Sequence, residues 1–414
     1  MKAMPALAPL IDGREHFLRC ADEIGRRLCR DALRAGDSLN WLRAEPEWRE
    51  NLPQTLVRPV GADLYQGAAG IALFLAQLHH RAGDRLVART ADQALALAEA
   101  GAAGDGFYTG AGGVGAAMLS IGLMRDDGGL VERGLDGIGR AAGRVTGTDL
   151  LDGAAGLVPA LLTLARNHGR ADLHQQALRL GTRLLDSANR ADAPTGFAHG
   201  SSGLLPALAS LHLATGDASW ADALTRLLHR ERALFNPQAG NWPDYRDAGG
   251  QPSGKPRFGA SWCHGAAGIG RSRLWLLAAG AQDPALDSEL DASLRAVAAV
   301  LTRPPGLEPP DFSYCHGLAG MADLMLDAGL WRNRPDLVSL AAGIGLQGIE
   351  RHAAPRTPWP CAIRGVGEVP GLMTGLAGIG HFYLRLHDPL TSGSVLLPDP
   401  YLGTRNIPTG ETKR

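Results

Sequence analysis

Seven strongly apolar segments recur along the chain, and each begins with the pattern Gly-x-x-Gly. The first glycines of these patterns are Gly67, Gly110, Gly153, Gly200, Gly265, Gly317 and Gly375. Successive first glycines lie 43, 43, 47, 65, 52 and 58 residues apart. A single pattern of this kind means little in a glycine-rich chain, but seven at quasi-regular spacing predict stacked copies of one structural unit.

Each copy is predicted to be a helical hairpin. The segment after the glycines is apolar on all sides, as in IALFLAQLHHRAG, and predicts a buried inner helix. A more amphipathic segment follows, as in DRLVARTADQALALAEAG, with apolar residues near i, i+3, i+4 and i+7. No stretch alternates with period two for long enough to predict a sheet. The chain is therefore expected to be all-α, with its hairpins stacked into a solenoid or closed into a ring.

If every pattern opens an inner helix, the residues just before the glycines lie at one end of the protein. The residue directly before the first glycine is, in chain order, Gln66, Thr109, Asp152, His199, His264, His316 and Thr374. The residue one position earlier is Tyr65, Tyr108, Leu151, Ala198, Cys263, Cys315 and Met373. Because consecutive repeats are neighbours in space, the chemically active residues of the third to sixth repeats are expected to form one contiguous sector.

Thiols and imidazoles in this sector point to a metal site. Cys263, Cys315 and His316 suit a soft, tetrahedral ion, and zinc is the leading candidate. A site with three protein ligands, assembled from separate elements of the chain and with a fourth position open, is typical of catalytic zinc. The alternative is that each cysteine is a small core residue and each histidine a satisfied buried group. Two Cys-His-Gly tripeptides in the same register favour the metal site.

Two further residues of the sector have both a structural and a functional interpretation. Asp152 stands at a helix start, where a carboxylate can simply cap exposed N–H groups. His199 can be structural too, although its place beside the metal sector favours a functional role. Cys20, Cys29 and Cys361 lie outside the sector and are expected to be inert thiols. The Pro/Gly-rich residues 236–260 are expected to form a loop over the mouth, as a lid or a peptide contact.

Composition and charge exclude several classes of protein. The 414 residues carry a formal net charge of -1, so the composition shows no excess of positive charge of the kind that binds nucleic acid or an anionic membrane. Glycine reaches 55 residues without a three-residue period, which excludes a collagen-like chain. Five cysteines are too few for a disulfide scaffold, and no apolar run is long enough for a membrane span. Without a signal peptide, the expected location is the cytoplasm.

The motifs SWCHGAAGIG, YCHGLAG, GFAHGSSG and PGLMTGLAGIGHFYLRL resemble those of the lanthionine synthetase C-like cyclases, especially the cyclase half of class II lanthipeptide synthetases. The resemblance covers roughly residues 60–400. It implies an α,α-toroid of seven inner and seven outer helices with one catalytic zinc per chain. It also implies Cys263, Cys315 and His316 as zinc ligands, and His199 with Asp152 as the acid–base pair. His264 competes with His199 for the acid role.

The chain also departs from the stand-alone class I cyclases. Those usually have Tyr after the first zinc cysteine, where this chain has His264, as class II enzymes do. They carry an arginine four residues before that cysteine, where this chain has Gly259, and Arg257 is out of register. A large dehydratase domain normally precedes class II cyclase halves and has no room here, so a separate dehydratase is an expected partner. The expected domains are a helical extension at 1–55, the toroid at 56–400 and a flexible tail at 401–414.

The implied reaction makes thioether rings in a dehydrated precursor peptide. A peptide cysteine loses its proton at zinc, which lowers a thiol pKa, and adds to dehydroalanine or dehydrobutyrine. His199, oriented by Asp152, then protonates the enolate. Two alternatives stay open: addition of glutathione to dehydrated peptides by the same residues, and a non-catalytic peptide-binding scaffold that keeps zinc for structure. Protein prenyltransferases, which are also α,α-toroids that use zinc, are a remote third.

Overall fold

The computed structural model describes residues 13–49, 52–189, 194–246, 252–304, 311–363 and 366–403. These residues form two compact units. Unit 1 takes its described residues from Met1–Gly101, Pro304–Ser394 and Gly403–Arg405. Unit 2 takes them from Ala102–Arg303 and Val395–Leu402.

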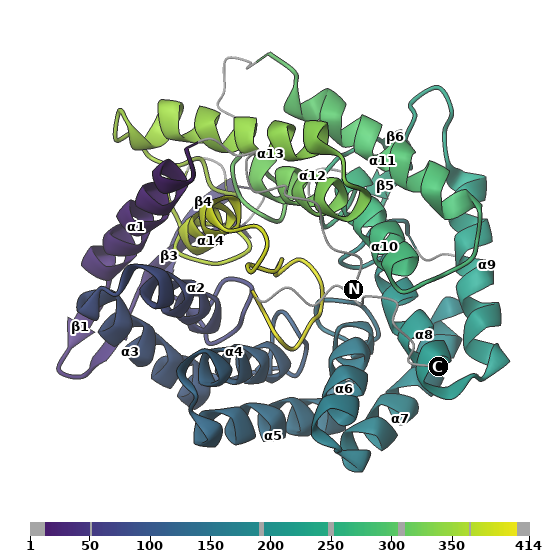
Figure 1. Ribbon diagram of the computed structural model, residues 1–414, viewed down its shortest axis with the longest axis horizontal. Helices are drawn as coiled ribbons and strands as arrows, with labels where there is room; N and C mark the ends of the chain where they lie inside the picture. Colours follow the sequence, from purple (N-terminus) through teal and green to yellow (C-terminus); the bar gives the residue numbers. More distant parts are fainter. Residues whose placement is uncertain are drawn as a thin grey trace. The chain divides into compact units, whose positions relative to one another are not determined.

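Unit 2 consists mainly of helical hairpins, in chain order (Figure 1). Its inner helices are α4 (Ala111–Arg125), α6 (Ala154–His168), α8 (Ser201–Thr215) and α10 (Ala266–Ala278). Their outer partners are α5 (Gly128–Arg144), α7 (Ala171–Ala188), α9 (Ala218–Leu234) and α11 (Ala285–Leu301). The inner helices are buried along most of their length because they are apolar on all sides, as the sequence predicts.

Unit 1 contains the other inner helices, α2 (Ala68–Ala82), α12 (Leu318–Arg332) and α14 (Leu376–His387). The first two pack with the helices that follow them, α3 (Arg85–Gly101) and α13 (Pro335–Gly348). A π-helical turn, η2 (Ile349–Ala353), extends α13. The described residues after α14 form no further helix. Its outer partner is instead α1 (Arg14–Asp31), from the other end of the chain.

The pairing of α1 with α14 rests on an apolar face of α1. Phe17, Ile24 and Leu28 on this face are buried. A hydrogen bond between Nδ1 of His387 and the carbonyl of Arg14, 3.1 Å long, ties the end of α14 to the start of α1. The N-terminal helix thus completes the repeat set. The expected domain boundary at residues 55/56 stays a prediction.

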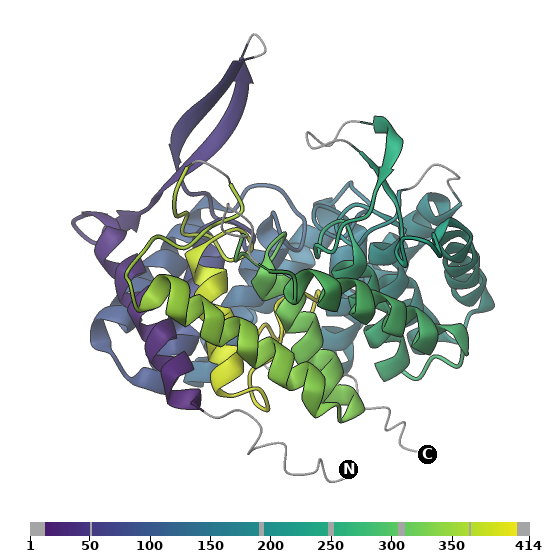
Figure 2. The same cartoon turned by 90° about the horizontal axis from the view of Figure 1, so that it is seen from above.

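Residues 33–59 contain strands, although the sequence predicted a helical extension up to residue 55 and the toroid from residue 56. β1 (Leu33–Ala35) pairs with β2 (Ser38–Asn40), and β3 (Leu42–Arg49) pairs with β4 (Leu52–Pro59), both antiparallel. Figure 2 shows the β3–β4 hairpin extending away from the helices of unit 1. The helical expectation was wrong here because Pro46 and Pro53 break a helix, while strand edges tolerate proline.

The Pro/Gly-rich segment of unit 2 is likewise not an irregular loop. It contains the antiparallel strands β5 (Asp244–Arg246) and β6 (Pro252–Arg257). The expectation of no sheet therefore fails for the hairpins β1–β2, β3–β4 and β5–β6, which lack the long period-two alternation of a half-buried strand. None of the three belongs to the helical repeats.

Each Gly-x-x-Gly pattern opens an inner helix directly after its first glycine, as predicted. In the repeat of α10, a Cβ at Gly265 would lie 2.5 Å from the carbonyl oxygen of Gly259. A Cβ at Gly268 would lie 2.0 Å from the carbonyl oxygen of Trp262. The loop folds back over the helix start so that carbonyls of residues 259–261 accept hydrogen bonds from N–H groups of residues 266–268. Only glycine leaves room for this close approach.

The predicted register of the repeats is confirmed by backbone hydrogen bonds between equivalent positions. In unit 2, the N–H of Ala198 donates to the carbonyl of Cys263 over 3.0 Å. In unit 1, the N–H of Cys315 donates to Met373, and the N–H of Met373 donates to Tyr65, each over 2.8 Å. All five residues stand two positions before the first glycine of their own repeat. Consecutive pre-helix loops are therefore adjacent within each unit.

The segment Val395–Leu402 packs into unit 2. The hydroxyl of Tyr108 donates to the carbonyl of Val395, and Nε1 of Trp262 donates to the carbonyl of Leu396, both over 3.0 Å. Of the tail expected at 401–414, residues 401–403 are buried, and residues 404–414 lie outside the described part. The first twelve residues of the expected N-terminal extension also lie outside it. None of the described helices has the length and apolarity to cross a membrane.

Candidate metal and acid–base site

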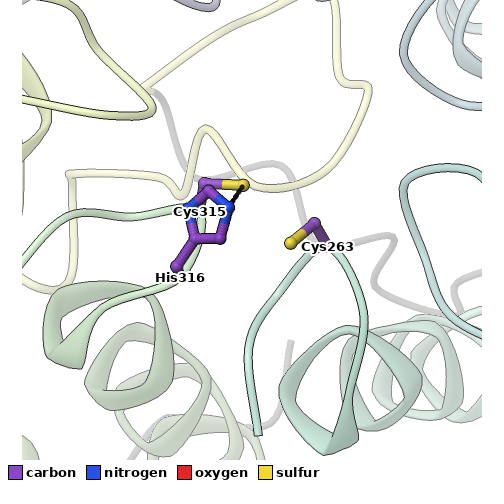
Figure 3. Close-up of side chains that lie close together, drawn as sticks. All are labelled: Cys263, Cys315 and His316. Atoms are coloured by element: carbon purple, nitrogen blue, oxygen red, sulfur yellow. Dashed lines mark hydrogen bonds between the residues drawn. The ribbon is translucent and has the colours of Figure 1, made fainter. Parts of the chain in front are cut away.

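Cys315 and His316 stand at the start of α12 in unit 1 (Figure 3). Cys315 is 1% exposed, whereas His316 reaches solvent. The Sγ atom of Cys315 lies 3.8 Å from Nε2 of His316. Ligand atoms on a tetrahedral zinc, with Zn–S near 2.3 Å and Zn–N near 2.0 Å, lie roughly 3.6 Å apart. The two donors therefore have a separation that suits one zinc ion.

A tyrosine supports the Cys315 thiol. The hydroxyl of Tyr65 donates a hydrogen bond to Sγ of Cys315 over 2.7 Å. Such a bond stabilises the thiolate form that a metal requires and fixes the direction of the sulfur. Tyr65 stands in the same register as Cys315, two residues before its own glycine. The sequence shows this register, but we assigned Tyr65 no role from it.

Cys263 stands in the loop before α10 in unit 2, and Figure 3 shows its side chain there. Its thiol is 6% exposed. Its carbonyl accepts hydrogen bonds from the N–H groups of Phe197 and Ala198, each over 3.0 Å. The hydroxyl of Ser261 lies 3.6 Å from its sulfur. Contacts from the preceding repeat and from its own repeat thus fix the position of Cys263. The thiol lies near the N-terminus of α10, the positive end of the helix dipole.

The imidazole of His199 is paired with Asp149, not with Asp152. Nδ1 of His199 lies 2.8 Å from Oδ2 of Asp149. Because an ionised carboxylate only accepts, the imidazole donates this bond. The bond and the negative charges of Asp149 and Asp152 raise the pKa of His199 above its ordinary value, against opposing effects of burial and Arg246. His199 therefore holds its proton more readily than a free imidazole.

Asp152 has a different environment from the one expected. Its carboxylate accepts a hydrogen bond from the hydroxyl of Thr109. Its backbone N–H donates to Oδ1 of Asp149 over 2.7 Å. Asp149, Asp152 and His199 have their polar atoms within 4.8 Å of one another, so Asp152 contributes charge near the imidazole.

Sequence reasoning missed Asp149 because its position has a plain structural explanation. It stands four residues before Gly153, and Asp63 stands four residues before its own glycine. Oδ1 of Asp63 accepts the N–H of Gln66 over 2.7 Å, the same turn contact that Asp149 makes. The recurring carboxylate is a signal for a turn. That its second oxygen reaches an imidazole of the next repeat is visible only in three dimensions.

His264 lies against His199, with ring centroids 5.7 Å apart and an interplanar angle of 25°. Its Nε2 lies 2.9 Å from a guanidinium nitrogen of Arg246. A guanidinium only donates, so Nε2 accepts and the ring is neutral. Burial is the main reason why the pKa of His264 falls to about 4. Its Nδ1 has no hydrogen-bond partner among the described residues.

Arg246 on β5 is the guanidinium that contacts His264 in unit 2, and sequence reasoning did not find it. Its Nε donates to Asp244 over 2.8 Å, which orients the side chain toward His264. The family resemblance puts an arginine at Gly259. A Cβ at that position would lie 3.0 Å from the carbonyl oxygen of His264, which leaves little room for a side chain. Arg257 lies at the exposed end of β6. The Asp-x-Arg sequence of β5 is too common to be a signal by itself.

The three cysteines outside the sector, Cys20, Cys29 and Cys361, are buried thiols that form no disulfide. Burial raises the pKa of Cys361 to about 12 and raises the pKa values of Cys20 and Cys29 as well. A thiol with a raised pKa stays protonated and is a poor nucleophile and metal ligand. These environments agree with the expectation of inert thiols.

Among the described residues, the arrangement defines a class: a mainly α-helical protein with six helical hairpins and a seventh helix pair, α14 with α1, whose pre-helix loops carry thiols, imidazoles and carboxylates. The lanthionine synthetase C-like protein family matches residues 58–397. This match covers most of the 414 residues, and the chain therefore belongs to that family.

Solved structures agree on the fold. The structure of nisin cyclase has a TM-score of 0.61 at 16% identity, covering 79% of this chain and 89% of that one. This similarity confirms the expected α,α-toroid fold. No curated protein is significantly similar to the chain in sequence.

Two groups of glycoside hydrolases are more weakly similar. The GH76A α-1,6-mannanase of Salegentibacter sp. HEL1_6 has a TM-score of 0.42 at 12% identity, covering 90% of this chain and 99% of that one. A mutant unsaturated glucuronyl hydrolase of Streptococcus agalactiae has a TM-score of 0.46 at 11% identity, covering 91% and 95%. At these TM-scores the similarities say nothing about this chain's function.

Proposed function

We propose that the protein is a zinc-dependent lanthipeptide cyclase, which forms lanthionine and methyllanthionine rings in a dehydrated precursor peptide. The observation that carries the proposal is the pair of Cys-His-Gly loops that precede α10 and α12 in the same register, in a member of the lanthionine synthetase C-like family. The His199–Asp149 pair adds a proton donor in the neighbouring repeat. These are the groups that a thiol addition followed by a proton transfer requires.

Cys263, Cys315 and His316 are the proposed ligands of one zinc ion. Two thiolates and an imidazole are donors that zinc prefers, and three protein ligands leave a fourth position for a substrate. When bound, zinc lowers the pKa of a substrate thiol so that the thiolate predominates near neutral pH. The support is the chemistry of the donor set, the burial of both thiols and the 3.8 Å separation of the Cys315 and His316 donor atoms.

The reaction needs no oxidant or reductant. The peptide thiol releases its proton to solvent water, its thiolate forms an S–C bond with the β-carbon of the dehydroamino acid, and the C=C π-bond electrons move to give an enolate. One proton must then reach the α-carbon. We assign this proton to His199, whose raised pKa favours the charged imidazole and whose side chain is 41% exposed. Asp149 holds the imidazole and stabilises its protonated form.

Arg246 has a different role in the same step, and the neighbouring His264 is not the proton donor. The neutral His264 accepts from Arg246 at Nε2, so it is not a proton donor there. Arg246, fixed by Asp244, is a permanent positive charge next to the two stacked imidazoles. We assign it to the enolate oxygen, whose negative charge a preorganised guanidinium stabilises. It takes the place of the arginine that the family resemblance puts at Gly259.

The substrate requires prior removal of water from serine or threonine side chains. A separate dehydratase is therefore the proposed partner, and the precursor peptide is the proposed substrate. All five cysteines lie in the described part of the chain and none of them forms a disulfide, which fits a reducing compartment such as the cytoplasm.

The test uses the purified protein and a dehydrated peptide that contains cysteine. Alkylation followed by mass spectrometry counts the free thiols, because ring formation leaves the mass unchanged and removes one thiol per ring. We expect thiol loss that depends on zinc and on Cys315. Cys361→Ala, a buried cysteine outside the proposed site, is the matched control.

Two results would replace the proposal. Adducts with added glutathione, in the absence of ring formation, would make the protein a glutathione-adding enzyme. Tight binding of the dehydrated peptide without any thiol loss would make it a non-catalytic scaffold.

A further inference from the structure

Unit 1 contains a cavity of about 900 Å³ that lies on α1 and includes neither cysteine of the proposed metal site in its lining. It is lined on one side by α1 and on the other by η2 and the residues that follow it. The lining includes five arginines: Arg19, Arg26, Arg27, Arg30 and Arg356. Glu23 is the acidic residue among the lining residues. We call this feature the arginine cavity.

Three of these arginines are held in place by acidic residues outside the lining. Arg26 pairs with Asp84 over 2.6 Å, and Arg27 pairs with Glu368 over 2.8 Å. Arg30 pairs with its neighbour Asp31. The side chains of Arg26 and Arg30 are 55% and 69% exposed, and exposed ion pairs of this kind are weak. They can exchange their partner for a ligand carboxylate at little cost.

The other two arginines of the cavity form no ion pair with the described residues. Among the described residues, no carboxylate lies within ion-pair distance of Arg19 or Arg356, and both side chains are exposed. Arg19 comes from α1 and Arg356 from the turn after η2, so the two contribute from different elements. Cations that line a concave surface raise the local concentration of anions.

The floor of the arginine cavity is apolar. Cys20, Ile24 and Trp359 line it and are each 3% exposed. An inorganic anion needs neither this apolar surface nor this volume, which falls near the upper end of ordinary ligand sites. A fitting ligand carries carboxylates for the rim and apolar groups for the floor.

We propose that the arginine cavity binds an acidic, partly apolar segment of the peptide substrate, outside the residues that form rings. The identity of this peptide as the substrate rests on the proposed cyclase function. Arginine binds carboxylates through paired hydrogen bonds, and several guanidinium groups on one rim suit a run of Glu or Asp. Holding a remote segment raises the effective concentration of the reacting residues at the catalytic site.

Binding is measured by fluorescence anisotropy on the full-length protein. The probe is a short fluorescein-labelled peptide rich in Glu and Leu, and the matched probe has Gln in place of every Glu. The test variant combines Arg19→Glu with Arg356→Glu. The control variant combines Arg179→Glu with Arg295→Glu, which changes the net charge equally on exposed positions of α7 and α11.

We expect the wild type and the control variant to bind the Glu probe, and the test variant to bind it at least tenfold more weakly. Added NaCl should weaken binding, and the Gln probe should bind poorly. Equal affinity of test and control variants, or equal affinity for both probes, would overturn the proposal. Displacement of the Glu probe by pyrophosphate at a lower concentration than by unlabelled peptide would also overturn it, in favour of a phosphate site.

Failure of the proposed function gives a different result. The binding assay needs neither zinc nor ring formation, so a protein that binds the Glu probe but consumes no thiol contradicts only the cyclase. Conversely, the test variant should cyclise a short dehydrated peptide without an acidic segment as fast as the wild type. A circular dichroism melt of each variant shows whether its fold is retained.

Discussion

The Nδ1 atom of His199 lies 2.8 Å from the carboxylate of Asp149, although the two residues belong to different repeats. The other oxygen of the same carboxylate accepts the backbone N–H of Asp152. Asp149 therefore shapes the turn before its own helix and also orients an imidazole of the next repeat. The proton donor of the proposed reaction is held by a residue whose first role is structural.

The first prediction separates the two aspartates. Asp149→Asn should slow ring formation by roughly 10- to 100-fold, the range for a partner that orients a functional imidazole. Asp152→Asn should have a smaller effect, because Asp152 contributes only charge near the ring. His199→Asn should cost roughly 10²–10⁴-fold, as for loss of a general acid. Rates of thiol loss and zinc content are measured on the same samples. A larger loss for Asp152→Asn than for Asp149→Asn would reverse the assignment.

The second prediction concerns pH. His199 donates its proton only when it is charged, and its pKa is raised above the ordinary value near 6.5. Activity should be present below this raised pKa and fall as the pH rises through it. In Asp149→Asn the main cause of the increase is gone, so the alkaline limb of the rate profile should move to lower pH. An unmoved alkaline limb would remove His199 from the proton transfer.

The third prediction concerns the metal. The protein as purified should hold about one zinc per chain, as a single site with three protein ligands implies. Cys263→Ala, Cys315→Ala and His316→Ala should each sharply lower the zinc content measured by mass spectrometry of the metal. Cys20→Ala and Cys361→Ala are matched controls, since both thiols are buried outside the site. Zinc loss in the controls alone would refute the ligand assignment.

The fourth prediction tests Arg246. Arg246→Ala should lower the rate of ring formation roughly 10²–10³-fold, the range for removing one group that stabilises an oxyanion, with zinc retained. Arg246→Lys should recover part of the rate because it restores the charge but not the guanidinium geometry. Arg257→Ala, on the paired strand β6, is the control and should be as active as the wild type. Full activity of Arg246→Ala would leave the enolate charge to another group.

The fifth prediction concerns the repeat glycines. Gly268→Ala should destabilise the protein by about 1–3 kcal/mol or more, because its Cβ would lie 2.0 Å from the carbonyl oxygen of Trp262. Gly143→Ala, in α5 with open space around the added Cβ, should instead stabilise by about 0.4–1 kcal/mol. Thermal melts of both variants decide the matter. Equal melting temperatures would mean that the loop before α10 moves to accept a side chain.

Much of the fold is local, and the sequence predicts it. Each helix start is set by a glycine that alone tolerates the approach of its own loop, as at Gly265, and this spacing is readable along the chain. The register of Cys263 and Cys315 follows from the same spacing, since both precede their glycine by two residues. Proline-containing strands such as β3 lack the long alternation of a core strand, and the sequence did not reveal them.

Other features depend on contacts between distant residues, and only the tertiary structure decides them. The helix that covers α14 is α1, which comes from the opposite end of the chain, because an inner helix needs an apolar partner but not one adjacent in sequence. The partner of His199 is Asp149 because the side-chain directions of facing loops, not the repeat register, determine which carboxylate reaches an imidazole. Arg246 reaches His264 from a hairpin outside the repeats, where no periodicity exists from which to infer its place.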